Sequence, residues 1–375
     1  KKLIVLDPVT TELANLANYH IKLRPGTNVA VLNMMLHFIV KAKLYNADFI
    51  RDRTEGFEKF IKEIERQDVD QLAKVAGVDK QLVKEAAIAY ATAGNSMEFH
   101  GLGVTEHEQG SKTVMLIADL AMITGNIGRK GVGVNPLRGQ NNVQGAADMG
   151  CQPHQGAGYF NVADQKVQQY YSEKYGVTHP TKPGLKIPQM FDAAINKELK
   201  GVWIIGEDIV QTDPNSAHVI EAMESLEFLV VQEIFMSETA KLATVVLPGP
   251  TFLEKDGTFT NTERRIQRVN RAAPPLPGTK PDGVIVAEMM QRFGFKQPDY
   301  NADQVLKEIA DVVPFFKGVT RERLGAYGLQ WPVEEDGTDT KILYKETFKL
   351  GKGQLKNFDW KESTEIETNQ KEYPL

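Results

Sequence analysis

The stretch from Gly125 to Gly150 reads GNIGRKGVGVNPLRGQNNVQGAADMG. It is too rich in glycine and asparagine for a helix or a sheet core, and too long for an ordinary turn. Glycine lets the backbone approach a ligand closely, while Asn and Gln side chains offer hydrogen-bond donors and acceptors. One cation, Arg138, stands among uncharged polar residues in the second half. The composition predicts a loop that binds a large anionic ligand with a small anion beside it; a long polar connection is the alternative.

The residues at the start of the chain predict a layered α/β domain. KKLIVLDP is a short apolar run ending at Asp7, which is typical of a buried parallel strand. Residues 20–28 form a second strand that runs into a glycine turn, and an apolar helix is expected over residues 29–41. Ligands of such sheets bind outside the carboxyl ends of the strands, where Asp7 and residues 25–28 lie.

Asp7 is a candidate for reading guanine, because a carboxylate can accept from both N1–H and the 2-amino group of that base. No other common base offers this paired donor edge. The alternative is that Asp7 only starts an Asp-Pro turn.

Residues 48–93 read as amphipathic helices with a structural role. A strand then runs into a glycine-rich turn, where the backbone at Gly101 and Gly103 can approach a cofactor. His100 and the Glu106–His107–Glu108 run could suggest a metal site, but their order has no recognisable ligand spacing. A helix is expected over residues 111–124.

The second half repeats the pattern of the first. GVWIIGEDIVQTD is a strand that runs into a polar turn, and SLEFLVVQEIFMSETAKLATVVLPG follows as strand, helix and strand. LIVLDPVTTELANLA aligns with LVVQEIFMSETAKLA without gaps, which places Asp7 on Glu233. Two similar halves, each with an acidic residue at a strand end, suit a ligand with two similar ends.

Composition excludes several classes of protein. The 375 residues carry a net charge of −5, which gives no basic field for nucleic acid. No apolar run approaches the roughly 18 residues of a membrane span. The single cysteine, Cys151, rules out an internal disulfide and a zinc or iron–sulfur site built from this chain's cysteines. Cys151 itself is expected to be a buried neutral thiol, with a metal ligand as the alternative.

RGQNNVQGAADMG, with MITGNIGRKGVGVNP before it, closely resembles the catalytic subunit of molybdenum- or tungsten-dependent formate dehydrogenases. These are bis-molybdopterin-guanine-dinucleotide oxidoreductases, and the resemblance covers essentially the whole chain. It implies two-electron oxidation of formate to carbon dioxide, or the reverse. It also implies a 4Fe-4S cluster whose ligands lie outside this chain, and electron-transfer subunits or a ferredoxin-like or NAD-linked acceptor. Contacts with nucleic acid or membrane are not expected.

The resemblance and the strand-end positions together define the candidate site. Arg138 is the candidate catalytic residue, because a guanidinium holds a carboxylate through two parallel hydrogen bonds. No metal ligand is expected on this chain. The candidate cofactor-binding residues are Asp7, Gly26, Thr27, Asn28, Gly101, Gly103, Gly139, Gln140, Asn141, Asn142, Gly206, Glu207, Asp208, Gln211, Thr212, Gln232 and Glu233.

The expected architecture is two Rossmann-like layered α/β domains with pseudo-twofold related halves, plus a smaller α/β segment. The expected boundaries are 1–140 and 141–250 for the two cofactor-binding domains, 251–345 for the smaller segment and 346–375 for a linker. Both ends look cut, so the chain is expected to be the middle of a larger catalytic subunit and inactive alone. A cytoplasmic location is expected, with export not excluded.

Three alternatives remain open. A sister enzyme such as a cytoplasmic nitrate reductase would lack RGQNNVQG and its arginine. A non-catalytic subunit like the large iron–sulfur subunit of respiratory complex I shares sequence similar to EKDGTFTNTERR but has a degenerate pterin site. A plain nucleotide-binding module would contact guanine without a metal.

Overall fold

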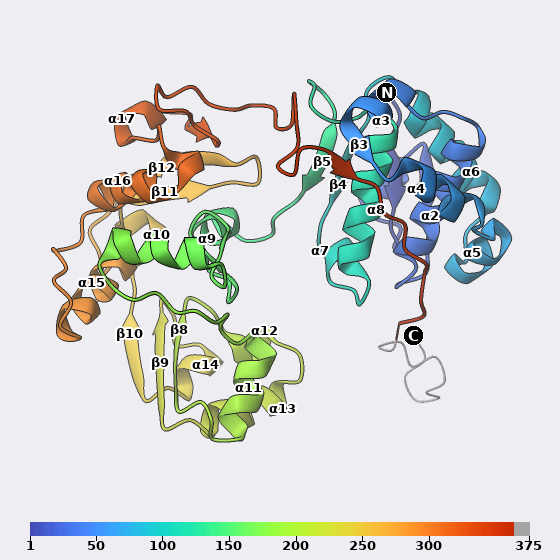
Figure 1. Ribbon diagram of the computed structural model, residues 1–375. Coiled ribbons are helices and arrows are strands. Elements are labelled where there is room, and N and C mark those ends of the chain that lie inside the picture. The colour runs from blue at the N-terminus through green and yellow to red at the C-terminus, as the bar shows by residue number, and fades with distance from the viewer. Residues whose placement is uncertain (364–375) are drawn as a thin grey trace. The chain divides into compact units, whose positions relative to one another are not determined.

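A computed structural model describes residues 1–363 of the chain (Figure 1). The chain forms two compact units. The first comprises Lys1–Gly139 together with the described residues from Ile342 onward, and the second comprises Gln140–Lys341.

The first unit is built around one buried helix, α2 (Asn28–Lys41). Its apolar side chains are covered on several sides by α4 (Phe57–Glu65), α5 (Val69–Ala76), α6 (Lys80–Thr92) and α8 (Gly110–Ile123). A helix that is apolar almost all round must be enclosed in this way, since any exposed face would leave hydrophobic surface in water. Shorter elements complete this part: α3 (Ala47–Arg53) and β3 (Thr54–Glu55).

Two parallel strand pairs accompany these helices. β1 (Ile4–Leu6) pairs with β2 (Tyr19–Ile21), and α1 (Glu12–Asn15) connects them. β4 (Met97–His100) pairs with β5 (Gly133–Pro136), with α7 (Leu102–Thr105) and α8 between them in the chain. Strands that run parallel end at the same edge, so the residues following β4 and β5 emerge side by side.

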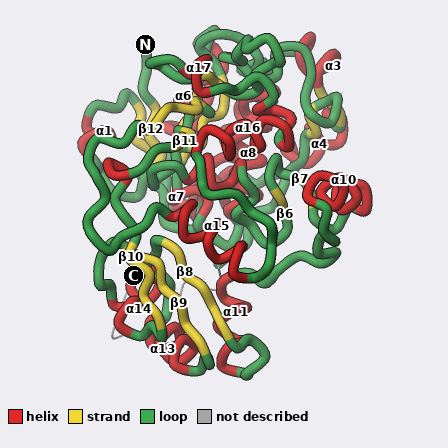
Figure 2. The backbone as a smooth tube through the Cα atoms, turned by 90° about the vertical axis from the view of Figure 1, so that its left-hand side faces the viewer, coloured by secondary structure: helices red, strands yellow, loops and turns green. Residues whose placement is uncertain are grey.

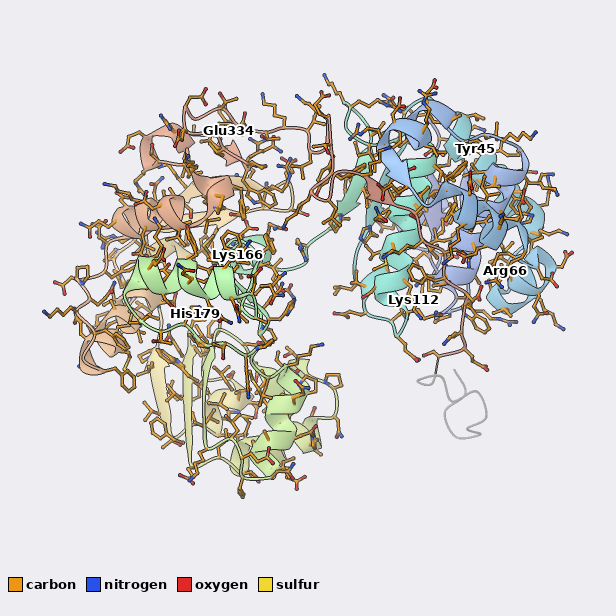
Figure 3. All side chains as sticks on the ribbon, viewed as in Figure 1. Tyr45, Arg66, Lys112, Lys166, His179 and Glu334 are labelled. Atoms are coloured by element: carbon orange, nitrogen blue, oxygen red, sulfur yellow. The ribbon has the colours of Figure 1, made fainter. Side chains whose placement is uncertain are left out.

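The segment expected as a linker, 346–375, packs against the first unit over its described part. β14 (Gly353–Gln354) pairs with β3, and Leu355 is buried. Asn33 Nδ2 donates to the carbonyl oxygen of Phe358 over 2.8 Å, and Arg66 (Figure 3) pairs with Asp359 at 3.0 Å. Residues 364–375 lie outside the described part of the chain.

The second unit contains a three-stranded parallel sheet in the order β10–β9–β8, whose strands lie side by side in Figure 2. The strands are β8 (Gly201–Ile205), β9 (Phe228–Glu233) and β10 (Val245–Pro248). α11 (Ile187–Ile195), α12 (Ile209–Thr212), α13 (Ser216–Glu224) and α14 (Glu238–Lys241) belong to the same layered part. Its core includes Val219, Leu229 and Val231, which are almost fully buried.

The second unit also contains an antiparallel sheet. β12 (Arg265–Val269) lies between β11 (Gly257–Thr260) and β13 (Leu329–Gln330). Around it are α9 (Val143–Asp148), α15 (Asp282–Arg292), α16 (Ala302–Val312) and α17 (Arg321–Leu324), with two single-turn helices at Phe252–Glu254 and Pro314–Phe316. α10 (Gln165–Tyr175) follows the small hairpin of β6 (Gln155–Gly156) and β7 (Phe160–Asn161).

The strand–helix–strand repeat expected from the sequence is present in the structure. β1, α1 and β2 form one copy, and β9, α14 and β10 form the other. The strand registers agree with the ungapped alignment: Ile4 pairs with Tyr19, and the aligned Val230 pairs with Val245. Both copies are parallel pairs joined by a one-turn helix. The expected mixed α/β class is confirmed.

The glycine-rich stretch Gly125–Gly150 differs from the expectation that it would hold no regular structure. It contains β5, and α9 begins directly after Asn142. Asn142 adopts a left-handed backbone (φ 60°), and this turn starts the short helix in VQGAAD. The glycines of this stretch therefore form turns, and a short strand and a short helix lie between these turns.

Candidate functional site

The first group of candidate residues lies at the carboxyl ends of β4 and β5. His100 ends β4 and pairs in register with Pro136, which ends β5. The backbone N–H of Leu137 donates to the carbonyl oxygen of His100 over 2.7 Å, which extends the pairing by one step. Gly101 and Arg138 follow these strand ends, and Arg138 is exposed.

His100 is the most enclosed polar side chain at this edge. Only 7% of its surface is exposed, and its Nδ1 atom is buried without a hydrogen-bond partner in the described part of the chain. Burial lowers the pKa of His100, and the positive charge of Arg138 lowers it further. The imidazole therefore favours its neutral form, with one donor and one acceptor nitrogen.

A neighbouring group comes from the turn after β2. Asn28 Nδ2 donates to the carbonyl oxygen of Gly103 over 3.1 Å, which joins two candidate residues that are distant in sequence. Thr27 Oγ1 donates to the carbonyl oxygen of Arg24 over 2.6 Å and holds the turn closed. Gly26 has φ 79°. A positive φ of this size is easy for glycine and strained for other residues, which explains the residue type.

Asp7 follows β1 as expected. Its Oδ1 accepts from the backbone N–H of Val9 over 2.8 Å, and its carbonyl oxygen lies 3.0 Å from His20 Nε2. One carboxylate oxygen thus shapes the turn. Both proposed roles of Asp7, turn former and guanine reader, are compatible with this geometry, since a carboxylate has about four acceptor positions.

In the second unit, the turn after β8 is held together by Asp208. Its Oδ1 accepts from Thr239 N at 2.9 Å and Thr239 Oγ1 at 2.6 Å, and its Oδ2 accepts from Gln211 at 2.8 Å. Burial acts to raise the pKa of Asp208, but the hydrogen bonds from Thr239 and Gln211 outweigh it and lower the pKa. Asp208 and Gln211 therefore stabilise the turn that presents Gly206 and Glu207.

Gly206 and Glu207 are the exposed part of this turn. Gly206 has φ 66°, and a Cβ atom added there would meet nothing within 4 Å. Although Glu207 is exposed, partial desolvation of its carboxylate, and then the charge of Asp213, raise its pKa. Thr212 Oγ1 lies 3.2 Å from the carbonyl oxygen of Asp208, within the same turn.

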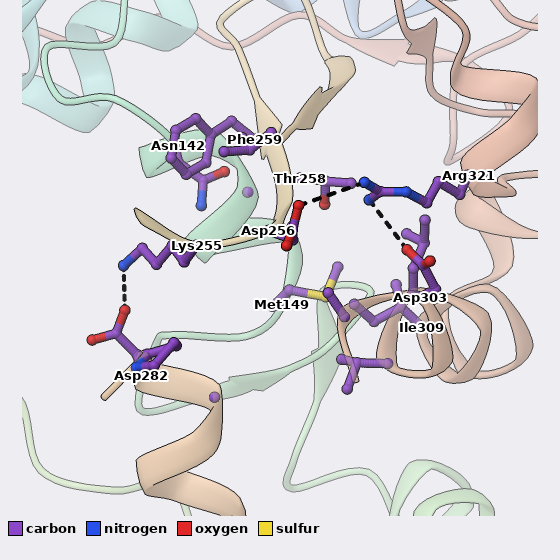
Figure 4. A pocket seen from close by; sticks show the side chains of 18 of the residues that line it. Asn142, Met149, Lys255, Asp256, Thr258, Phe259, Asp282, Asp303, Ile309 and Arg321 are labelled. Atoms are coloured by element: carbon purple, nitrogen blue, oxygen red, sulfur yellow. Dashed lines mark hydrogen bonds and ion pairs between the residues drawn. The ribbon is translucent and has the colours of Figure 1, made fainter. Parts of the chain in front are cut away.

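Gln232 and Glu233 end β9. Gln232 is 1% exposed; its Nε2 donates to Asp282 Oδ1 over 2.7 Å, while its Oε1 is buried without a partner among residues 1–363. Asp282 also pairs with Lys255, as Figure 4 shows. Glu233 Oε1 accepts from the backbone N–H of Ile234 over 2.6 Å. The carboxylate at this strand end thus shapes its own turn, as Asp7 does.

The second half of the RGQNNVQG motif is anchored in the interior of the second unit. Asn142 Oδ1 accepts from the backbone N–H of Thr260 in β11 over 2.9 Å. Gln140 and Asn141 are exposed. Asn142 is therefore at least partly a structural residue, which the sequence alone did not reveal because Thr260 is far away in the chain.

Asp148 was missed by the sequence reasoning and is the best-bonded carboxylate of the region. It is fully buried and accepts from Gln144 Nε2 (2.8 Å), Tyr159 OH (2.7 Å) and Trp331 Nε1 (2.8 Å). The four-residue spacing of Gln144 and Asp148 on one helix face was a signal for part of this network. The network fixes α9, whose first turn follows the motif.

A cavity of about 260 Å³ lies within the second unit (Figure 4). Arg321 reaches it and pairs with Asp303 at 3.1 Å and Asp256 at 3.7 Å. Of the candidate site residues, Asn142 is among those that line it. Asp256, which belongs to the EKDGTFTNTERR segment, thus has a structural partner outside that segment, Arg321.

The described residues contain no group of three or more His, Cys, Asp or Glu side chains that could hold a metal ion. This includes His100 and the Glu106–His107–Glu108 run. Cys151 is exposed, so the expectation of a buried thiol was wrong. It follows the turn at Gly150, and its backbone N–H donates to the carbonyl oxygen of Ala146 over 3.0 Å. No helix among residues 1–363 is both long and apolar enough to cross a membrane.

Residues 1–292 match the family model described as molybdopterin oxidoreductase. The chain belongs to this family. It is 42% identical, over 100% of its length, to 56% of the F420-dependent formate dehydrogenase subunit alpha of Methanocaldococcus jannaschii. It is 38% identical, again over 100% of its length, to 53% of formate dehydrogenase H of Escherichia coli.

The chain spans about half the length of these curated relatives. Among solved structures, acetylene hydratase from Pelobacter acetylenicus superposes with a TM-score of 0.65 over 86% of this chain and 46% of that one. The sequence identity is 20%, so this likeness concerns the fold alone.

Membership of the molybdopterin oxidoreductase family implies a molybdopterin cofactor with molybdenum or tungsten. The residues present fit such a polar group. At the strand ends of their respective units, His100 Nδ1 and Gln232 Oε1 are buried and have no hydrogen-bond partner within residues 1–363. Gly103, Gly139 and Gly206 each have open space where a side chain would stand. These features leave backbone and side-chain groups available to a heteroatom-rich ligand.

Proposed function

We propose that this chain is part of the catalytic subunit of a molybdenum- or tungsten-dependent formate dehydrogenase. The observation that carries the proposal is the exposed Arg138, which follows the carboxyl end of β5 within RGQNNVQG. The two curated relatives described above are named formate dehydrogenases, which supports the same substrate.

Arg138 would position the substrate. Formate is a small planar anion, and a guanidinium can bind both of its oxygens through parallel N–H donors. Arginine stays charged at any working pH, so the guanidinium is available to bind the formate anion in every turnover. Arg138 lies two residues after the last residue of β5 and is exposed.

Two guanine-pterin groups would bind at the strand ends of the two repeat copies. Asp7 and Glu233 would each accept from the paired donors of a guanine edge, with the glycines of the candidate set allowing close backbone approach. When bound, this cofactor would supply the two-electron redox chemistry. The chain's own residues would bind, orient and shield it.

Other parts of the enzyme would complete the path of the electrons. We assign to the whole protein a 4Fe-4S cluster with ligands outside this chain, and an electron-transfer subunit or soluble acceptor as partner. The cytoplasmic location remains a prediction.

The test uses the full-length protein that contains this chain. Metal, pterin and guanine are quantified per subunit, and formate-dependent reduction of an artificial dye is measured. One metal, two pterins and formate oxidation are expected. Metal and pterin without formate oxidation would assign the protein to another substrate within the family. A folded protein without metal or pterin would favour a structural, electron-conducting role.

A further inference from the structure

His100 and Arg138 share one edge of the first unit. The register of β4 and β5 places the end of one strand beside the end of the other. A backbone hydrogen bond joins His100 to Leu137, the residue directly before Arg138. The guanidinium is near enough for its charge to act on the imidazole. The two side chains therefore interact electrostatically although they are far apart in the sequence.

The imidazole has a buried ring nitrogen without a hydrogen-bond partner in the described part of the chain. It is 7% exposed, and its Nδ1 atom is buried without a partner among residues 1–363. Buried polar atoms in folded proteins almost always have a hydrogen-bond partner, so this atom calls for one. Burial and the nearby cation both favour the neutral imidazole, in which one ring nitrogen carries no proton and accepts.

The chemistry of the neighbour decides what that partner is. A guanidinium has five N–H donors and no acceptor, so an unprotonated ring nitrogen complements it. A carboxylate uses two of these donors, so a protein acceptor can bind one of the remaining N–H groups. We propose that Nδ1 of His100 accepts a hydrogen bond from the Arg138 guanidinium and thereby orients it toward a small bound anion.

His100 is thus a positioning residue that acts through Arg138. The identity of the anion as formate rests on the proposed function, whereas the pairing of the two side chains does not. Holding the guanidinium in one orientation reduces the freedom lost when the anion binds, so affinity for the anion should depend on His100.

The experiment compares three variants of the full-length, cofactor-loaded protein with the wild type. His100→Phe keeps an aromatic ring and removes the acceptor. His100→Asn retains an acceptor at the δ position. His37→Phe is the matched control, because His37 lies in α2 and its Nδ1 is 3.0 Å from the carbonyl oxygen of Ile64, within the helical core.

Affinity for azide, a small non-reacting anion, is measured by calorimetry, and KM and kcat for formate are measured separately. His100→Phe should weaken azide binding and raise the formate KM about tenfold, the size expected for one hydrogen bond to a charged group. The kcat should change much less. His100→Asn should recover most of the affinity, and His37→Phe should leave it at the wild-type value.

Coupling to Arg138 is measured in a double-mutant cycle. In an Arg138→Ala background, His100→Phe should have no further effect on azide affinity. Unchanged affinity in His100→Phe alone, equal losses in the presence and absence of Arg138, or failure of His100→Asn to recover affinity would each overturn the inference. If His100→Phe does not fold, His100→Gln replaces it. The amide oxygen of glutamine lies one bond further from the backbone than Nδ1 of histidine, so it does not occupy the Nδ1 position.

The azide measurement also separates this inference from the proposed function. A wild-type protein that does not oxidise formate but loses azide affinity in the predicted pattern would contradict the substrate and support the pairing. Azide affinity that does not depend on Arg138 would overturn the pairing even if formate is the substrate.

Discussion

Asp7 and Glu233 occupy equivalent positions in two copies of one strand–helix–strand unit. Each carboxylate accepts from a backbone N–H of its own turn, from Val9 at 2.8 Å and from Ile234 at 2.6 Å. The equivalence includes the helix caps: Thr11 Oγ1 accepts from Ala14 N at 3.2 Å, and Ser237 Oγ accepts from Ala240 N at 3.1 Å. Two turns built alike are suited to binding two like groups.

Asp7→Asn should reduce the guanine-pterin content of the full-length protein. The amide loses one of two acceptors facing a paired donor edge, and a hydrogen bond to a charged group contributes about 1.5–3 kcal/mol, which is about tenfold or more in affinity. Glu233→Gln should act in the same direction but less strongly, because the longer side chain is less restrained. Glu12→Gln, an exposed residue of the same repeat copy, should leave the content unchanged. Equal content in all four proteins would exclude guanine reading by these carboxylates.

Asp148→Asn should lower the melting temperature of the protein. The neutral amide weakens three hydrogen bonds to a fully buried group and turns one of its own N–H groups toward donors. A loss of about 2–4 kcal/mol in the free energy of unfolding is expected. The exposed Asp311→Asn provides the same change of charge on α16 and should have little effect. Calorimetry on both variants measures the difference, and similar melting temperatures would show that the Asp148 network contributes little.

Gly128→Ala should be more harmful than Gly94→Ala. Both glycines have positive φ values, 79° and 74°, so both substitutions carry the same backbone strain of about 1 kcal/mol. An added Cβ at Gly128 would lie 2.4 Å from the carbonyl oxygen of Tyr344, whereas at Gly94 it would meet nothing within 4 Å. A larger drop in melting temperature for Gly128→Ala is the expected result. Equal drops would mean that the chain around Tyr344 moves aside easily.

Glu98 makes the stability of the first unit depend on pH. Burial raises the pKa of Glu98 to about 8, although the hydrogen bond from Tyr90 opposes the change. The folded state then binds more protons than the unfolded state between the unfolded pKa, 4.5, and about 8. Stability should therefore fall as pH rises through this window. Glu98→Gln should reduce the difference between melting temperatures at pH 5 and pH 8, while a steeper dependence in the variant would contradict this assignment.

Much of the fold followed from local patterns. Short apolar runs ending in Asp or Glu predicted the strand ends, and the ungapped repeat predicted the same order of strand, helix and strand in both copies. The pairing of the two strands in each copy comes from the structure. The contacts of residues 346–363 could not be anticipated in this way. Asn33 and Phe358 are joined by one hydrogen bond across most of the chain, and no local pattern carries that information.

The sequence singled out Arg138, and the structure places it exposed after the end of β5; its contact with a substrate stays a prediction. The candidate site was less predictable where a polar residue could serve either the ligand or the fold. Asp208 and Asn142 were both expected to face the cofactor, yet their carboxylate and amide oxygens bond to Thr239 and Thr260. Polar residues near a cofactor region also hold its turns, and only tertiary contacts separate the two roles.

The most direct test of the central claim is formate oxidation per bound metal in Arg138→Ala and Arg138→Lys. If Arg138 holds formate through two parallel hydrogen bonds, kcat/KM should fall at least about a hundredfold in the alanine variant, which loses both charge-assisted bonds. The lysine variant should recover only part of the loss, because an ammonium cannot reproduce the planar fork. Metal and pterin content should stay close to the wild type. Unchanged kcat/KM per metal, or loss of the cofactor together with activity, would show that Arg138 does not position the substrate.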